Sequence, residues 1–389
     1  MINEVEIKFN NIKILNNYSQ ISHSLRKENE RFKTRYYILD NYKGILIFLV
    51  VFAHLLIGYS NNKKSSSLLI RKIIVFIYSF HMPAFIFISG LLSSENSTKF
   101  SNAIKLIILY YIFNYTQALF LFLYIKKQIS FLEPSLSCWY LLSLFFWRIS
   151  IKFLNKIKFI FIISIIVNLL EGYWECFNNI LSVVRTIAFY PFFLAGYKIS
   201  SLNLLRKFLA WRKGILNYIL AFFSFISFVI AFSIYIDKNN IINEVFLMVS
   251  YKKNNQVNDR AFIMLIASLM IFFNILLIPN FKIPLISKMG RNSLYIYLFH
   301  RVITIIIQVE YLNHIYNSLY VIGNSFILSF LISLIFGSDF ISKVGNSSLN
   351  SIHKNILESN NKGNIIKFIF SLYFILLLLI KPINQFINT

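Results

Sequence analysis

Long apolar runs separated by short polar segments repeat along most of this chain. Each run is close to the ~20 residues that an α-helix needs to cross a bilayer. We expect eleven spans, at residues 42–60, 72–92, 104–125, 138–155, 157–170, 183–200, 214–236, 261–279, 292–312, 316–337 and 365–386. The pattern predicts an all-α polytopic membrane protein with about ten to eleven transmembrane helices around a central polar cavity.

Three polar stretches interrupt or flank the apolar runs, at residues 1–35, about 237–260 and about 338–363. Their Asn- and Ser-rich composition is typical of loops and weakly ordered tails. We therefore divide the chain into a cytoplasmic polar tail at 1–35, a membrane domain at 36–340, and a polar loop with a candidate extra transmembrane helix at 341–389.

The apolar composition of the chain and its positive charge both fit a membrane protein. Hydrophobic residues make up 57% of the 389 positions, and the mean hydropathy is +0.64. The net charge of +24 fits positive cytoplasmic loops and contact with membrane lipid, so we expect no nucleic-acid partner. Most Lys and Arg residues precede the first span or follow even-numbered spans. This bias predicts a cytoplasmic N-terminus in the inner (plasma) membrane.

His54 is the most informative polar residue, because it lies inside the first apolar span. Ionisable side chains at membrane depth are costly and usually face a protein interior or a wet cavity, where they do chemistry. Lys43 precedes His54 by eleven residues, which places both on one helix face about 16 Å apart, and Asp40 falls on nearly the same stripe. The alternative is that Asp40 and Lys43 end the helix at the interface and His54 is an interhelical hydrogen-bond donor.

Further ionisable residues fall at similar depth. His81 lies in the second span next to Pro83, which is expected to kink that helix, and His300 lies in the ninth. Three buried histidines favour a proton-handling or acyl-handling site. Arg185 opens the sixth span, where it can hold an anionic group or a developing oxyanion; the alternative is an ion pair with Glu171 or Glu175. The histidines are scattered without a carboxylate motif, so we expect no metal.

Several ordered motifs together resemble the acyltransferase 3 family of membrane O-acyltransferases, and within it the fucose 4-O-acetylase-like branch. The motifs are the run from Asp40 through Lys43 to His54 and the segments His81–Gly90, Trp139–Trp147, Arg185–Tyr197 and Gly290–His300. The resemblance implies that His54 is catalytic, and that acetyl-CoA or another acyl-CoA is a donor substrate rather than a resident cofactor. It also implies O-acylation of a sugar hydroxyl on a surface glycan or lipid-linked saccharide.

The donor end departs from the family pattern. Many members carry Arg where this chain has Lys43, and two arginines where it has only Lys99 and Lys105. These three lysines can still attract the CoA phosphates as point charges. His54 would then act as a general base or a transient acyl carrier, and His81, Arg185 or His300 would stabilise the oxyanion or relay the proton. The competing interpretation is a glycan transporter or flippase that uses buried His and Arg.

Overall fold

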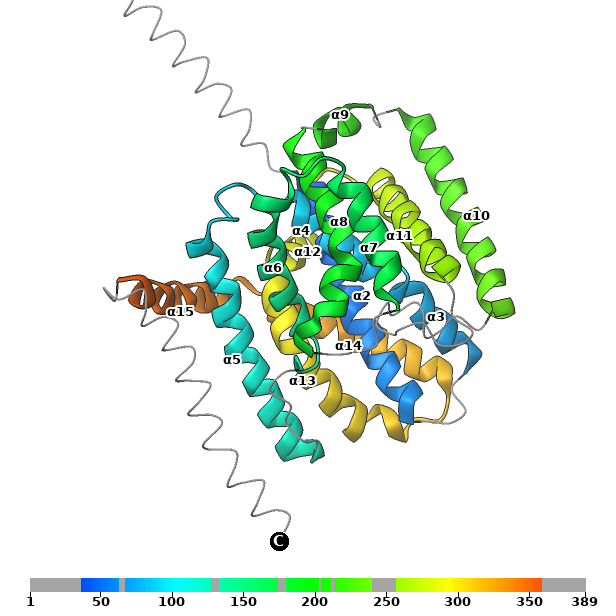
Figure 1. The fold of residues 1–389 in the computed structure, drawn as a ribbon. Helices are drawn as coiled ribbons and strands as arrows, with labels where there is room; N and C mark the ends of the chain where they lie inside the picture. Colours follow the sequence, from blue (N-terminus) through cyan, green and yellow to red (C-terminus); the bar gives the residue numbers. More distant parts are fainter. Residues whose placement is uncertain are drawn as a thin grey trace, which may run out of the picture.

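A computed structural model describes residues 36–62, 67–126, 133–173, 180–202, 204–211, 214–239 and 257–358, and no strand occurs in these ranges (Figure 1). The helices are α2 (Tyr37–Asn62), α3 (Leu68–Tyr78), α4 (His81–Leu91), α5 (Phe100–Ile125), α6 (Trp139–Leu154), α7 (Ile160–Glu171), η2 (Ile180–Ser182), α8 (Val183–Ser201), α9 (Leu204–Trp211), α10 (Ile215–Asn239), α11 (Val257–Leu277), α12 (Pro284–Arg291), α13 (Ser293–Glu310), η4 (Leu312–His314), α14 (Ser318–Phe336) and α15 (Asp339–Glu358).

The first ten expected spans each coincide with a helix or a pair of helices, and the eleventh lies outside the described residues. Six spans among the described residues are long and apolar enough to cross a membrane. The total of ten to eleven therefore stays a prediction. Exposed apolar side chains such as Leu123 on α5, Ile162 on α7 and Ile327 on α14 face outward. The described residues are helical with apolar outer faces, which is what a bilayer requires, so the protein is a membrane protein.

Helix α2 lies in the middle of the bundle and contacts α3, α4, α11, α12, α13 and α14 (Figure 1). Its start is fixed by the segment between α11 and α12, because the Asn41 side-chain amide donates to the carbonyls of Pro279 at 3.0 Å and Phe281 at 2.8 Å. Gly44 and Gly290 let the α2 and α12 backbones touch: a Cβ on Gly44 would overlap the Ile286 carbonyl, and one on Gly290 that of Asp40.

A second reciprocal glycine pair joins α4 to α8. A Cβ on Gly90 would overlap the Phe193 carbonyl, and a Cβ on Gly196 would overlap the Phe87 carbonyl. Small residues that allow backbones to approach are the usual basis of helix packing in membranes, where no hydrophobic effect drives two helices together. The α4–α8 contact thereby fixes where the second expected span lies in the bundle.

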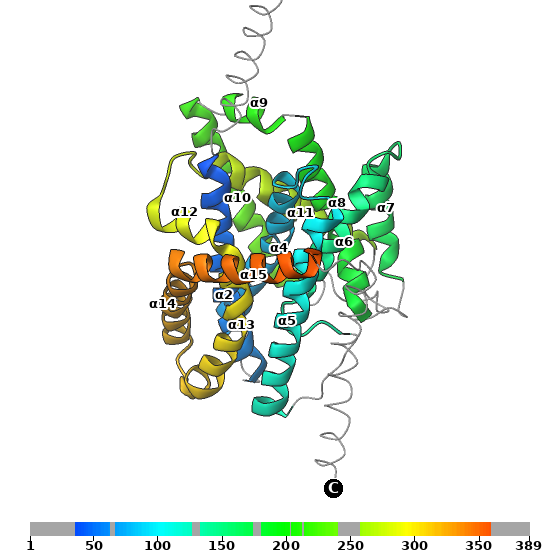
Figure 2. The same ribbon diagram turned by 90° about the vertical axis from the view of Figure 1, so that its left-hand side faces the viewer.

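The polar stretch at 338–363, expected to be a loop, is mostly helix α15, which crosses α5 and α13 (Figure 2). Its polar residues anchor it: Tyr295 donates to Asn346 at 2.8 Å, and Lys105 donates to Asn350 at 2.9 Å. A hydrogen bond from Asn292 and the nearby Lys288 lower the pKa of Asp339 at the start of α15. The loop prediction for this stretch is wrong, because its Asn-rich composition is also compatible with an amphipathic helix whose partners are distant in sequence.

Candidate active site

Helix α2 is unbroken from Tyr37 to Asn62, so Lys43 and His54 lie on one helix as expected. His54 is only half-buried although it lies in the centre of the bundle, so the protein leaves part of its surface uncovered. At the start of the stripe Lys43 Nζ lies 3.8 Å from Asp40 Oδ1, and Asp40 is buried. The structure therefore places an ion pair three turns before the imidazole.

Tyr78 meets His54 directly. The Tyr78 hydroxyl lies 3.1 Å from His54 Nδ1, within hydrogen-bond range, and the two rings are edge-on at 6.2 Å. Tyr78 is the last residue of α3, where the second expected span breaks before α4 begins at His81. Pro83 lies in the first turn of α4, where its missing N–H costs little. The helix is interrupted just before it, between Tyr78 and His81, and this interruption is the kink expected near Pro83. The break presents Tyr78 to His54.

His81 follows this break and is fully enclosed. Its Nδ1 lies 2.8 Å from the Ile77 carbonyl, which can only accept, so Nδ1 carries the proton. Its ring packs edge-on against Tyr78 at 4.6 Å, and it is close enough to interact electrostatically with His54. His81 therefore supports Tyr78 from behind, and the structure gives it no direct bond to His54.

His300 stacks against His54, with ring centroids 5.3 Å apart and planes 28° from parallel. Its Nδ1 lies 2.8 Å from the Tyr297 carbonyl and 3.1 Å from the Ile296 carbonyl, so this nitrogen is the donor. Nε2 then bears a lone pair, and it is buried without a hydrogen-bond partner among the described residues. An unsatisfied buried nitrogen is costly unless something occupies the site during function.

Two half-buried arginines add positive charge around the histidines. Arg301 follows His300 directly on α13, and its charge acts on both His54 and His300. Arg185 lies over the Trp139 ring at 5.2 Å, and the carboxylate of Glu133 acts on its charge. Arg301 is therefore close enough to His54 to balance negative charge that develops there.

The alternative role for Arg185, an ion pair with Glu171 or Glu175, is not supported for Glu171. Glu171 forms a buried ion pair with Arg260 of α11, and Arg260 also donates to the Asn168 carbonyl at 3.0 Å. Glu175 lies outside the described residues. The alternative pairing of Arg185 with Glu171 is therefore not seen, because Arg260 from another helix holds that carboxylate, and the pairing with Glu175 stays untested.

Gln308 fixes the backbone of α2 at His54. Its side-chain amide donates to the His54 carbonyl and contacts the Leu55 carbonyl at 3.4 Å. The amide fills the space above Gly58, where a Cβ would overlap it. This contact joins α13, which carries His300, to α2, which carries His54.

The three lysines expected at the donor end have separate surroundings. Lys43 faces Asp40, Lys99 is exposed at the start of α5, and Lys105 donates to Asn350 of α15. Their assignment to donor binding stays a prediction. Among the described residues, no three His, Cys, Asp or Glu side chains converge closely enough to hold a metal ion.

Sequence reasoning did not assign a role to Tyr78, Arg301 or Gln308. Arg301 carried a signal, since it follows His300 directly inside an apolar span. Tyr78 lies three residues before His81, but nothing in the sequence shows that it faces a different helix. The role of Gln308 depends on the absent side chain of Gly58, which only the packing reveals.

Comparison with known proteins agrees with this geometry. A family model described as the acyltransferase domain of the acyltransferase 3 family matches residues 36–338, which hold every residue of the site described above. No curated protein and no solved structure matches the chain. The family match covers most of the chain, and the apolar helices of the chain fit a membrane location. The protein therefore belongs to the acyltransferase 3 family and is a membrane acyltransferase.

Proposed function

We propose that this protein moves an acetyl or other acyl group from acyl-CoA to a sugar hydroxyl of a surface or exported polysaccharide, or of its lipid-linked precursor. The observation that carries the proposal is the half-buried His54, with a hydroxyl 3.1 Å from Nδ1 and a second imidazole stacked on its ring. The resemblance to sugar O-acetylases supports the acceptor class.

His54 is the proposed general base. The tautomer with its proton on Nδ1 donates to the Tyr78 oxygen and leaves Nε2 free to accept a proton. Nε2 takes the proton of the acceptor hydroxyl as that oxygen bonds to the thioester carbonyl carbon. Collapse of the tetrahedral intermediate breaks the C–S bond, and the proton passes from His54 to the leaving CoA thiolate.

Arg185 and Arg301 are the proposed groups that offset the negative charge on the tetrahedral oxygen. A positioned general base contributes roughly 10²–10⁴-fold, and oxyanion donors add a term of similar size. In the alternative mechanism His54 first takes the acyl group and then releases it to the acceptor. Intact-mass measurement after rapid acid quench separates the two, because only the carrier route adds an acyl mass to the protein.

The donor is proposed to arrive from the cytoplasm. Lys43, Lys99 and Lys105 fall on the predicted inner side, where they can attract the CoA phosphates and lead the thioester along the stripe to His54. His81 and His300 are proposed to hold the orientation of Tyr78 and to relay a proton, respectively.

The substrate classes are tested with purified full-length protein, labelled acetyl-CoA and a glycan extract. We expect label to appear in the glycan with release of CoA. The family assignment favours an enzyme over a glycan transporter. Glycan movement across proteoliposomes with no loss of thioester would contradict the proposal, and so would transfer of label only to protein or water.

A further inference from the structure

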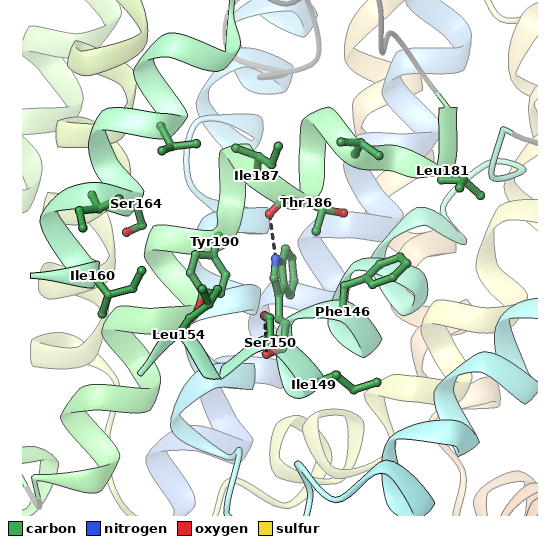
Figure 3. Close-up of a pocket in the computed structure, with 14 residues that line it drawn as sticks. Phe146, Ile149, Ser150, Leu154, Ile160, Ser164, Leu181, Thr186, Ile187 and Tyr190 are labelled. Atoms are coloured by element: carbon green, nitrogen blue, oxygen red, sulfur yellow. Dashed lines mark hydrogen bonds between the residues drawn. The ribbon is translucent and has the colours of Figure 1, made fainter. Parts of the chain in front are cut away.

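A second site lies away from His54, in a cavity of about 530 Å³ between α6, α7 and α8 (Figure 3). This volume is within the range of small-molecule sites. The cavity extends from Leu154 and Ile160, on either side of the α6–α7 turn, to Leu181 and Val183 at the start of α8. None of the residues that surround His54 lines it.

The lining presents carbon rather than hydrogen-bonding groups. Three of its polar side chains bond to the protein itself: Thr186 donates to the Ser182 carbonyl at 2.8 Å, Ser164 to the Phe161 carbonyl at 2.7 Å and Ser150 to the Trp147 carbonyl at 3.3 Å. The Tyr190 hydroxyl lies close to Ser150 and makes no hydrogen bond of normal geometry with a described residue. A sugar or a nucleotide would therefore lose hydrogen bonds on entering, whereas an alkyl chain would not.

The cavity opens on an exposed apolar surface of the molecule. Three lining residues keep much of their surface exposed: Phe146 at 43%, Ile163 at 41% and Leu181 at 39%. Their neighbours Ile162 and Ile166 on α7 are also exposed and apolar. A chain can therefore enter sideways from the bilayer without crossing water.

One end of the cavity carries concentrated positive charge. Three exposed lysines lie there. Lys156 and Lys158 are in the α6–α7 turn, between the lining residues Leu154 and Ile160, and Lys152 is in the last turn of α6. No acidic residue occurs between Glu133 and Glu171. Lys158 Nζ lies 5.1 Å from the centre of the exposed Phe159 ring, an arrangement suited to the membrane–water interface.

We propose that this cavity binds an anionic glycerophospholipid of the bilayer, with one acyl chain between α6, α7 and α8 and the phosphate on Lys156 and Lys158. The apolar lining selects the chain, and the lysines, unopposed by any acidic residue nearby in sequence, select the anionic headgroup. A bound chain would fill the gap between α7 and α6 and stabilise α8, which carries Arg185. The site is independent of the acyl-transfer chemistry, so its test does not use activity.

The test is native mass spectrometry of delipidated full-length protein with added palmitoyl-oleoyl phosphatidylglycerol or the matching phosphatidylcholine. Ile163→Trp fills the cavity, and Ile162→Trp adds the same bulk at the neighbouring exposed position outside it. We expect wild type and I162W to retain phosphatidylglycerol and I163W to retain at least roughly fivefold less. Equal retention by I163W and I162W overturns the site.

The headgroup contribution is tested with K156Q/K158Q and its matched control K282Q/K343Q, which removes two exposed lysines elsewhere. Each lysine near an anionic membrane surface contributes about fivefold. We therefore expect K156Q/K158Q to lose roughly tenfold or more in phosphatidylglycerol binding and to keep its binding of phosphatidylcholine. Equal losses in the two double variants would overturn the proposal.

Discussion

At the scale of single residues, the site is a half-buried imidazole with a defined neighbour on each side. Tyr78 meets Nδ1 of His54 at 3.1 Å, His300 stacks on its ring, and Gln308 holds its backbone carbonyl. The tautomers of His81 and His300 follow from the backbone carbonyls beside their Nδ1 atoms. This arrangement leaves Nε2 of His54 as the nitrogen proposed to face the substrate.

Tyr78→Phe tests whether the hydroxyl orients His54. We expect kcat to fall roughly 10- to 100-fold with little change in KM, because a small error in the orientation of a base is costly. The matched control is Tyr59→Phe, which removes the hydroxyl of another buried tyrosine, one that donates to the Ile315 carbonyl at 3.2 Å. If Y59F loses as much activity as Y78F, the orienting role is refuted.

Gln308→Met tests the backbone contact, because methionine keeps the length of the side chain but cannot donate to the His54 carbonyl. We expect kcat to fall by roughly threefold to tenfold through loss of positioning. Gly58→Ala should have a similar effect, since its Cβ would displace the Gln308 amide. Additive losses in the double variant G58A/Q308M would show that the two residues do not act through one contact.

At the scale of helices, two reciprocal glycine contacts decide which spans meet. The histidines His54, His81 and His300 could be assigned to separate spans from the sequence, and their depth indicated a shared site. Their convergence could not be derived, because it depends on contacts between helices distant in sequence, such as Gly58 of α2 against Gln308 of α13. The glycines are visible in the sequence, but their partners are distant in it. For the same reason α15 was mistaken for a loop.

Gly90→Ala tests the α4–α8 contact. The added methyl group would overlap the Phe193 carbonyl, which belongs to backbone and cannot move aside cheaply. We expect a loss of about 1–3 kcal/mol in the free energy of unfolding, as for other overpacked positions, measured as a lower melting temperature in detergent.

The matched control for that substitution is Gly323→Ala on α14, where a Cβ would meet nothing within 4 Å. Alanine favours a helix over glycine by up to ~1 kcal/mol, so G323A should be neutral or stabilising. A G90A protein as stable as G323A would mean that α4 and α8 are not held in backbone contact.

At the scale of the whole molecule, the chain is a helical membrane acyltransferase in which α2 carries the proposed base through the centre of the bundle. Hydropathy and composition were sufficient to predict this architecture, and ordered motifs were sufficient to predict the family. The number of spans and the acceptor could not be fixed in the same way, since short helices such as α6 and α7 are ambiguous by length alone.

The orientation of the chain in the membrane can be tested by labelling introduced cysteines. With the N-terminus in the cytoplasm, Asn96 between α4 and α5 falls inside and His314 between α13 and α14 falls outside. In a variant with Cys138 and Cys176 replaced by serine, we expect a membrane-impermeant maleimide to label His314→Cys but not Asn96→Cys in intact cells. Permeabilised cells should label both. The reverse pattern would invert the topology and place the three donor lysines on the wrong side.

The most direct test of the central claim is acyl transfer by His54→Ala, compared with His314→Ala, which removes an exposed histidine from η4. Both purified proteins are given labelled acetyl-CoA and the acceptor glycan, after equal melting temperatures confirm that they are folded. We predict a loss of roughly 10²–10⁴-fold for H54A and wild-type activity for H314A. Acyl transfer by folded H54A at the wild-type rate would contradict the account.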